Sequence, residues 1–127
     1  MSDTFHSSKP IYSQLVERIK KEIVRNDLKP GDKLPSVREM ALQSGVNPNT
    51  VQRTYRELES EKIAESKRGQ GTYVTENQVV LEEMRQRLKK EEISQFVSSM
   101  YEMGYQKEEI LTGLEEFFNK YNRGEKG

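Results

Sequence analysis

The stretch from Ser36 to Arg56, SVREMALQSGVNPNTVQRTYR, limits the fold of this chain more than any other. Ser36 followed three residues later by Glu39 forms the S-x-x-E pattern that caps the first turn of a helix. Gly45 can adopt the left-handed conformation that ends a helix and turns the chain sharply. Asn47 and Pro48 then supply the cap and the first residue of a second helix. The stretch therefore predicts two short helices joined by a tight glycine turn.

The sizes of the residues near the turn predict how these helices pack. Ala41 has no bulk, so the second helix can cross close above it, and Val46 and Val51 fill the wedge between the two helices. A small residue, a glycine four positions later and an aliphatic residue six positions after that are typical of a helix-turn-helix. In that motif the second helix lies in the major groove of DNA. An ordinary helical hairpin remains the alternative.

The second helix, expected over residues 47–61, has a polar and basic outer face. Val51, Tyr55 and Leu58 form its inward stripe. The residues left outside are Asn49, Thr50, Gln52, Arg53 and Arg56. Amide side chains can pair with adenine, arginines can pair with guanine or phosphates, and the helix N-terminus favours a nearby phosphate. A solvated helix face with no ligand is the alternative.

A β-hairpin is expected from Ile63 to Thr75, with its tip at residues 67–71. Gly69 and Gly71 permit positive φ angles and let the backbone approach a partner, and Lys67 and Arg68 add positive charge beside them. A basic, glycine-tipped hairpin after a recognition helix predicts a winged helix, whose wing reaches phosphates or the minor groove. A plain hairpin loop is the alternative.

A helix and a turn-rich link are expected before this region. Pro10 suits the first position of a helix, and apolar residues, with Tyr12 among them, recur at helical spacing as far as Ile23. The link DLKPGDKLP follows, and Pro30-Gly31 predicts a β-turn within it.

Residues 77–127 predict two further helices with apolar stripes, separated at Gly104. A single chain offers too few partners to cover both stripes, so pairing of two copies is expected. The residues assigned to this dimerisation are Leu81, Met84, Leu88, Phe96, Met100, Leu114, Phe117 and Phe118. Packing of both helices onto the N-terminal domain is the alternative. The predicted domains are thus residues 1–76 and 77–127.

The overall charge does not favour nucleic acid, because 21 basic and 21 acidic side chains cancel. Residues 1–76 hold 13 basic and 11 acidic side chains, so DNA binding has to rest on local placement. The absence of cysteine excludes disulfides and thiolate metal sites. No secretion signal and no apolar run of membrane-spanning length occurs, so no membrane contact and a cytoplasmic location are expected.

No catalytic arrangement is apparent. The only histidine is His6, and the paired glutamates of the tail fall on expected helix surfaces. We therefore expect no enzymatic activity, no metal site and no cofactor.

The first 75 or so residues resemble the DNA-binding domain of the GntR family of bacterial transcriptional regulators. The resemblance rests on the motifs PIY-x-Q, L-x-PG-x-x-LPS-x-R, NPNTV and RGQGTYV. The tail of about 50 residues is similar to that of the YtrA-like branch, which implies a two-helix dimerisation element and a repressor of an operon such as one for an ABC transporter. The implied partners are a second copy and a pseudo-palindromic double-stranded operator.

The family's DNA contacts transfer only where residues match. The resemblance implies such contacts for Arg38, Asn49, Thr50 and Gly69. Pro48 and Gln52 stand where some branches have arginine, so the base preference of those branches does not transfer. Gln52 and Arg53 are assigned to DNA contacts because of the side of the helix on which they lie and the chemistry of their side chains. The complete predicted DNA-binding set is Ser36, Arg38, Asn47, Asn49, Thr50, Gln52, Arg53, Arg56, Lys67, Arg68, Gly69 and Gln70. Lys62 replaces the glycine that is usual after the recognition helix.

The sequence therefore predicts a mainly α fold with a small β wing (α+β): an N-terminal winged helix-turn-helix followed by a two-helix dimerisation element. The predicted function is sequence-specific regulation of transcription. The alternative is a winged-helix module that binds another protein and has no specific DNA target. The tail could in addition bind a small-molecule effector of unknown identity between its helices.

Overall fold

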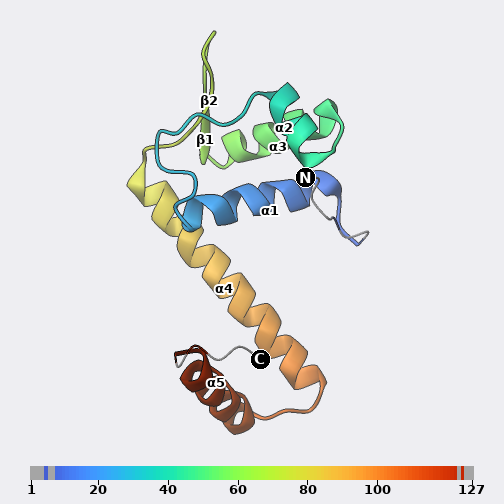
Figure 1. Ribbon diagram of the computed structural model, residues 1–127, viewed down its shortest axis with the longest axis vertical. Helices are drawn as coiled ribbons and strands as arrows, with labels where there is room; N and C mark the ends of the chain where they lie inside the picture. Colours follow the sequence, from blue (N-terminus) through green and yellow to red (C-terminus); the bar gives the residue numbers. More distant parts are fainter. Residues whose placement is uncertain (1–4, 6–7, 123, 125–127) are drawn as a thin grey trace. The chain divides into compact units, whose positions relative to one another are not determined.

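The computed structural model describes residue 5, residues 8–122 and residue 124, and these form five helices and one two-stranded antiparallel sheet (Figure 1). The elements are α1 (Ile11–Val24), α2 (Val37–Ser44), α3 (Pro48–Ser60), β1 (Ala64–Lys67), β2 (Gly71–Val74), α4 (Gln78–Glu102) and α5 (Lys107–Asn122). The chain divides into two compact units, Met1–Gln86 and Arg87–Gly127. The predicted mainly α fold with a small β wing is confirmed.

The core of the first unit lies where α1 and α2 pack against α3 (Figure 1). Its fully covered side chains include Leu15 and Ile19 of α1 and Val51 and Leu58 of α3. These residues recur every three or four positions, so each helix buries one apolar face and leaves the other to solvent. The packing fixes which side of α3 faces outward.

The local signals around α2 act as the sequence predicts. The Ser36 backbone N–H donates to Glu39 Oε1 over 2.9 Å, and the Glu39 N–H donates to Ser36 Oγ over 3.1 Å, which completes the capping box. Hydrogen bonding to the carboxylate, first from the Ser36 backbone N–H and then from the Ser36 side chain, lowers the pKa of the Glu39 carboxyl. Gly45 ends the helix with a φ of 68°. At α1, however, Pro10 is the N-cap and Ile11 the first helical residue, one position later than expected, because Pro10 is still extended with a ψ of 142°.

The link before α2 pairs with the wing, which the sequence did not indicate. The predicted turn is present, since the Asp32 N–H donates to the Lys29 carbonyl over 2.9 Å and Gly31 has a φ of 84°. Beyond the turn, Lys33 forms an antiparallel bridge with Tyr73 of β2. The small sheet is therefore braced on its β2 side by the link.

The Tyr55 hydroxyl fastens the same link to α3. It donates to the Pro35 carbonyl over 2.7 Å, and the Tyr55 side chain is buried. Burial raises the pKa of Tyr55, so the hydroxyl keeps its proton and remains a donor in the folded chain. This bond sets the position at which the chain enters α2.

The end of α3 is sharp although no glycine is present there. Lys62 adopts a φ of 65°, and the Ile63 N–H donates to the Leu58 carbonyl over 2.9 Å. This is the hydrogen-bond pattern of a glycine-terminated helix, so Lys62 takes the left-handed conformation in spite of its Cβ. The chain thereby turns directly into β1.

The second unit covers little of its apolar surface within one chain. Among its described residues, Ile110 is the only one classed as buried. Large side chains remain exposed along both of its helices, including Phe117 at 49% and Phe118 at 55%. A groove of 600 Å³ between these helices is lined by residues such as Ile93, Phe96, Val97, Ile110, Leu111 and Phe118.

The eight residues assigned to dimerisation differ in how far their own chain covers them. Met84 is buried within the first unit; Leu81, Leu88, Met100 and Leu114 are half-buried; Phe96, Phe117 and Phe118 are exposed. None of the helices in the described part of the chain combines the length and the apolar character needed to cross a membrane.

The strained end of α3 yields a first prediction. Lys62→Gly should raise the free energy of unfolding by about 0.5–1 kcal/mol, because glycine adopts positive φ without the Cβ clash. Lys62→Ala removes the same charge but keeps the Cβ, so it should give no such gain. Urea unfolding at a fixed protein concentration compares the three proteins. An equal gain from both variants would show that charge, not backbone strain, is responsible.

The Tyr55 hydrogen bond yields a second prediction. Tyr55→Phe should lower the free energy of unfolding at pH 7 by about 1 kcal/mol, since the bond is removed and the Pro35 carbonyl is left unpaired. Because the folded pKa of Tyr55 is raised, its contribution is complete below the unfolded pKa of about 10 and declines as pH rises above that value. The stability difference between the two proteins should therefore shrink in alkaline urea unfolding. Tyr101→Phe, at a 55% exposed position, serves as the control and should change little.

Candidate nucleic-acid interface

The start of α3 is built as a free helix N-terminus. Asn47 is the N-cap, and its Oδ1 accepts a hydrogen bond from the Asn49 N–H over 2.8 Å. Pro48 follows as the first helical residue, and Asn47, Pro48 and Asn49 are not buried. The N-terminal end of the helix macrodipole therefore meets solvent, where an anion such as a phosphate is favoured.

The predicted division of α3 into inner and outer faces is present. Val51, Tyr55 and Leu58 are buried, whereas Gln52, Arg53 and Arg56 are exposed, as is Asn49. Thr50 is half-buried, and its carbonyl accepts a hydrogen bond from the Thr54 hydroxyl over 2.8 Å. Because Asn49, Arg53 and Arg56 are spaced by four and three residues, they share one side of the helix, with Gln52 beside them. We call Asn49, Gln52, Arg53 and Arg56 the outer face of α3.

The acidic residues of α3 all lie toward its C-terminal end. Pro48 to Arg56 contains no carboxylate, and the glutamates begin at Glu57. Glu61, just past the helix, pairs with Lys20 of α1 over 2.8 Å, and Glu59 accepts a hydrogen bond from Ser66 over 2.5 Å. The N-terminal half of α3 is thus locally basic within a chain of zero net charge.

Arg53 is stacked on a residue of another helix, which the sequence did not indicate. Its Cζ lies 3.9 Å from the centroid of the Tyr12 ring on α1. Tyr12 is one of the residues that recur at helical spacing along α1, but its side chain is only half-buried. The aromatic ring was the only sequence signal that Tyr12 could contact an arginine. The helical periodicity favoured a core position instead.

The wing carries four further predicted DNA-binding residues at its tip. Lys67, Arg68, Gly69 and Gln70 are all exposed, at the end of β1 and in the turn before β2. Lys67 Nζ lies 4.5 Å from the centroid of the Tyr73 ring. Gly69 has a φ of 74° with no atom near the place of a Cβ, so its backbone is open to a close approach.

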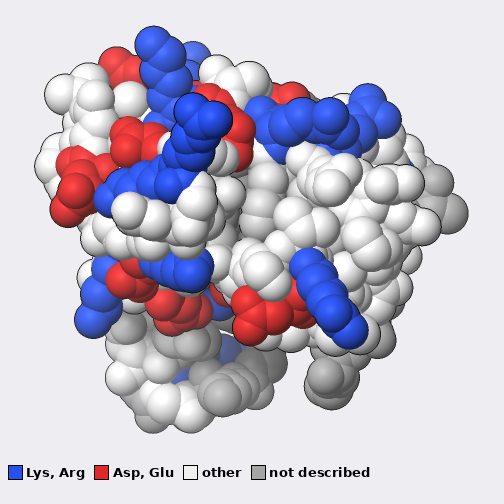
Figure 2. Space-filling view, turned by 90° about the horizontal axis from the view of Figure 1, so that it is seen from above, with Lys and Arg blue, Asp and Glu red and all other residues white. Residues whose placement is uncertain are grey.

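Figure 2 shows Lys and Arg side chains interspersed with Asp and Glu on the face seen from above. No single large basic patch covers this face. Any preference for nucleic acid on it therefore depends on a few placed side chains rather than on a broad positive field.

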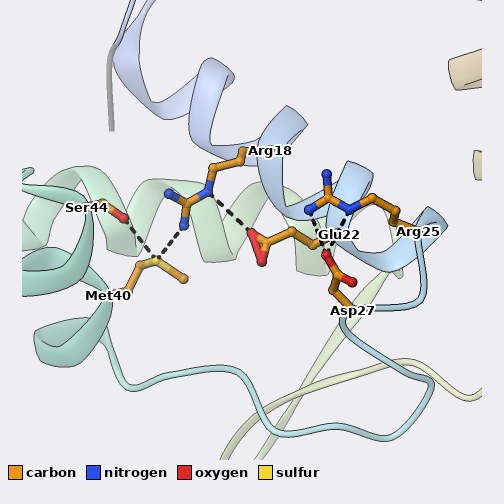
Figure 3. A network of polar contacts seen from close by, with 6 residues as sticks. All are labelled: Arg18, Glu22, Arg25, Asp27, Met40 and Ser44. Carbon is orange, nitrogen blue, oxygen red and sulfur yellow. Dashed lines mark hydrogen bonds and ion pairs between the residues drawn. The ribbon is translucent and has the colours of Figure 1, made fainter. Parts of the chain in front are cut away.

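Ser36 and Arg38 lie at the start of α2, where Arg38 is exposed, and this helix is held to α1 through a sulfur atom (Figure 3). The buried Met40 Sδ accepts hydrogen bonds from Arg18 Nη2 over 3.5 Å and from the Ser44 hydroxyl over 3.2 Å. Arg18 Nε also pairs with Glu22 Oε1 over 3.3 Å. The contact between Arg18 and Met40 joins α1 to α2, the helix that carries Arg38.

The described residues contain no group of three or more His, Cys, Asp or Glu side chains placed to hold a metal ion. His6 lies outside the described residues. The chemistry of the assembled side chains is that of hydrogen-bond donors and cations, which suits phosphates and base edges.

Two comparisons relate the sequence to known proteins. Residues 11–74 match the family model of bacterial regulatory proteins, gntR family. The uncharacterized HTH-type transcriptional regulator YhcF of Bacillus subtilis (strain 168) is 50% identical over 117 residues, which are 92% of this chain and 97% of YhcF. The HTH-type transcriptional repressor YtrA of the same organism is 40% identical over 121 residues, 94% of this chain and 93% of YtrA.

Solved structures extend the comparison to the fold. A GntR family transcriptional regulator from Listeria monocytogenes superposes with a TM-score of 0.82 and 42% identity, covering 88% of this chain and 98% of that one. The DNA-binding domain of AraR in complex with operator ORX1 superposes with a TM-score of 0.51 and 28% identity, covering 59% of this chain and 92% of that one. The family match, the two full-length relatives and the shared fold together identify this chain as a member of the GntR family, in its YtrA-like branch, and as a DNA-binding transcriptional regulator.

Proposed function

We propose that this chain is a homodimeric repressor that binds a pseudo-palindromic operator in double-stranded DNA. In each copy α3 enters a major groove, and the wing at residues 67–71 lies at phosphates or in the minor groove. From the similarity to the YtrA-like branch, we further propose an operon such as one for an ABC transporter as its target. An inverted repeat upstream of the gene's own operon is the first place to look for the operator.

The outer face of α3 is the observation that carries the proposal. Four side chains capable of base or phosphate contacts are exposed together, next to a helix N-terminus and before the first glutamate of the same helix. Arginine can donate two hydrogen bonds to guanine, and asparagine or glutamine can form a similar pair with adenine. An interface for another protein would instead place apolar or aromatic anchors at its centre.

The exposed apolar surface of the second unit supports dimerisation. Phe96, Phe117 and Phe118 are between 41% and 55% exposed, and Phe96 and Phe118 line the groove between the two helices. Monomeric proteins rarely leave so much contiguous apolar surface in water, and a second copy would cover it. Two copies would also present two α3 helices, which a pseudo-palindromic operator with half-sites about one helical turn apart requires.

The base-reading role of α3 makes a third prediction. Arg53→Ala should cost roughly 1–3 kcal/mol of binding free energy on the operator and relax the preference at one base position. Lys67→Ala should weaken binding to all sequences about equally and reduce the salt slope by about 0.9 for each phosphate that it no longer neutralises. Fluorescence anisotropy over a range of salt concentrations and single-base operator variants measures both effects.

Arg25, at the C-terminal end of α1, provides a matched control. Arg25 is the C-cap residue of α1 and pairs with Asp27 over 2.7 Å (Figure 3), so Arg25→Ala removes one positive charge outside the predicted DNA-binding set. Its operator binding should match that of the parent. The assigned face would be wrong if Arg53→Ala and Lys67→Ala also bound like the parent.

The dimer makes a fourth prediction. Phe118→Glu should weaken dimerisation at least tenfold, because burial of a phenylalanine is worth about 1.5–3 kcal/mol and a buried charge is unfavourable. Leu42→Glu is the control: Leu42 is 77% exposed on α2, in the first unit, and its replacement should leave the dimer intact. Sedimentation equilibrium measures both variants. Equal dimerisation of Phe118→Glu and the parent would exclude this surface as the interface.

A further inference from the structure

We propose that Tyr12 of α1 is a positioning residue for DNA recognition, whose ring holds the Arg53 guanidinium in place on the outer face of α3. The inference rests on the proposed function, since it assigns to Tyr12 a part in how Arg53 reads a base. It adds to the site a residue from outside the helix-turn-helix and the wing.

The geometry is that of a cation–π contact. The Arg53 Cζ lies 3.9 Å from the ring centroid, well inside the limit of about 6 Å for such contacts. Arg53 is exposed, in the second turn of α3, and Tyr12 is half-buried, in the first turn of α1. The ring therefore lies between the core and the exposed guanidinium.

The position of Tyr12 relative to α3 is fixed by the neighbour of Arg53. Thr54 is fully covered, and its hydroxyl, which donates to the Thr50 carbonyl, also lies 3.4 Å from the Tyr12 carbonyl. The two helices pack closely here (Figure 1). The ring is thus attached to a rigid platform rather than to a mobile segment.

Stacking leaves the hydrogen-bonding edge of Arg53 available. A guanidinium that lies against a ring covers one of its faces, whereas its N–H groups point outward in its own plane. Those groups are the ones that donate to guanine or to a phosphate. The contact restricts the side chain without using the donors that recognition needs.

Tyr12 also competes with a carboxylate for Arg53. Glu57 lies four residues further along α3, a spacing at which an arginine and a glutamate commonly pair. Glu61 raises the pKa of the Glu57 carboxyl, whereas the positive charge of Arg53 lowers it, so Glu57 and Arg53 lie close enough to interact. The structure nevertheless places the Arg53 guanidinium against the Tyr12 ring, and no ion pair between Arg53 and Glu57 is seen among the described residues.

The expected loss of operator affinity follows from the strength of exposed cation–π contacts. Such a contact shifts the equilibrium between the stacked and the free Arg53 side chain roughly two- to fivefold. A dimer uses two copies of Arg53, so the effect on operator affinity is the square, roughly 4- to 25-fold. Because pre-ordering Arg53 matters only where it reads a base, binding to random-sequence duplex should change less than about twofold.

A double-mutant cycle tests the proposal with the full chain and with a duplex that the parent protein selects from a random-sequence library. Tyr12→Leu should lose operator affinity by roughly 4- to 25-fold, and Tyr12→Phe, which keeps the ring, should stay within about twofold of the parent. In an Arg53→Ala background, Tyr12→Leu should cause no further loss. Tyr12→Met replaces Tyr12→Leu in the same cycle if thermal unfolding shows that the leucine variant does not fold.

The outcomes distinguish failure of the positioning role of Tyr12 from failure of the proposed function. An equal loss from Tyr12→Leu with and without Arg53 would overturn the positioning role, as would an Arg53→Ala variant that binds like the parent. Parental selection of an enriched duplex would leave the proposed function standing in both cases. Failure of the parent to enrich any duplex would overturn the proposed function itself.

Discussion

The burial of one side of α3 is the constraint on which the rest of the first unit depends. Val51, Thr54, Tyr55 and Leu58 are all covered by α1, α2 and the link before α2. Since these residues recur at helical spacing, their burial fixes the rotation of α3 about its axis and turns the opposite side chains to solvent. The hydroxyls of Thr54 and Tyr55 are both hydrogen-bonded, so neither donor is left unpaired in the core. The outer face is therefore a direct consequence of the packing behind it.

Because the net charge is zero, any preference for DNA depends more on the placement of individual side chains than on the electrostatic field of the whole chain. The glutamates of α3 lie beyond its second turn, where Glu59 accepts a hydrogen bond from Ser66. Glu61, just past the helix, pairs with Lys20, and the N-terminal half of the helix stays basic. On the proposed function, a single copy with so few base contacts would bind one half-site weakly. Joining two copies through the second unit would add the contacts of two half-sites, which explains why a chain with so modest an interface would need its apolar tail.

The parts of the fold that obey local rules could be predicted from the sequence, and the parts that depend on distant partners could not. Ser36 with Glu39, Gly45 and Asn47 with Pro48 act within a few residues of one another, so their capping and turning roles are visible in the sequence. The bridge from Lys33 to Tyr73 and the stack of Arg53 on Tyr12 join residues that are distant in the sequence and arise only from packing. At Lys62 the local rule calls for glycine, and the close return of the chain into β1 imposes the left-handed conformation on lysine instead.

The most direct test of the central claim is to locate α3 on DNA. The chain contains no cysteine, so Gln52→Cys, on the outer face of α3, would provide a unique attachment point for an iron–EDTA cleavage reagent. With the reagent in place, the account predicts two symmetric clusters of strand cleavage, centred about 10 base pairs apart, on a duplex selected by the parent protein. The same reagent at Lys21→Cys, an exposed position on α1, should not reproduce those clusters. A single cluster, or identical patterns from the two positions, would contradict the account.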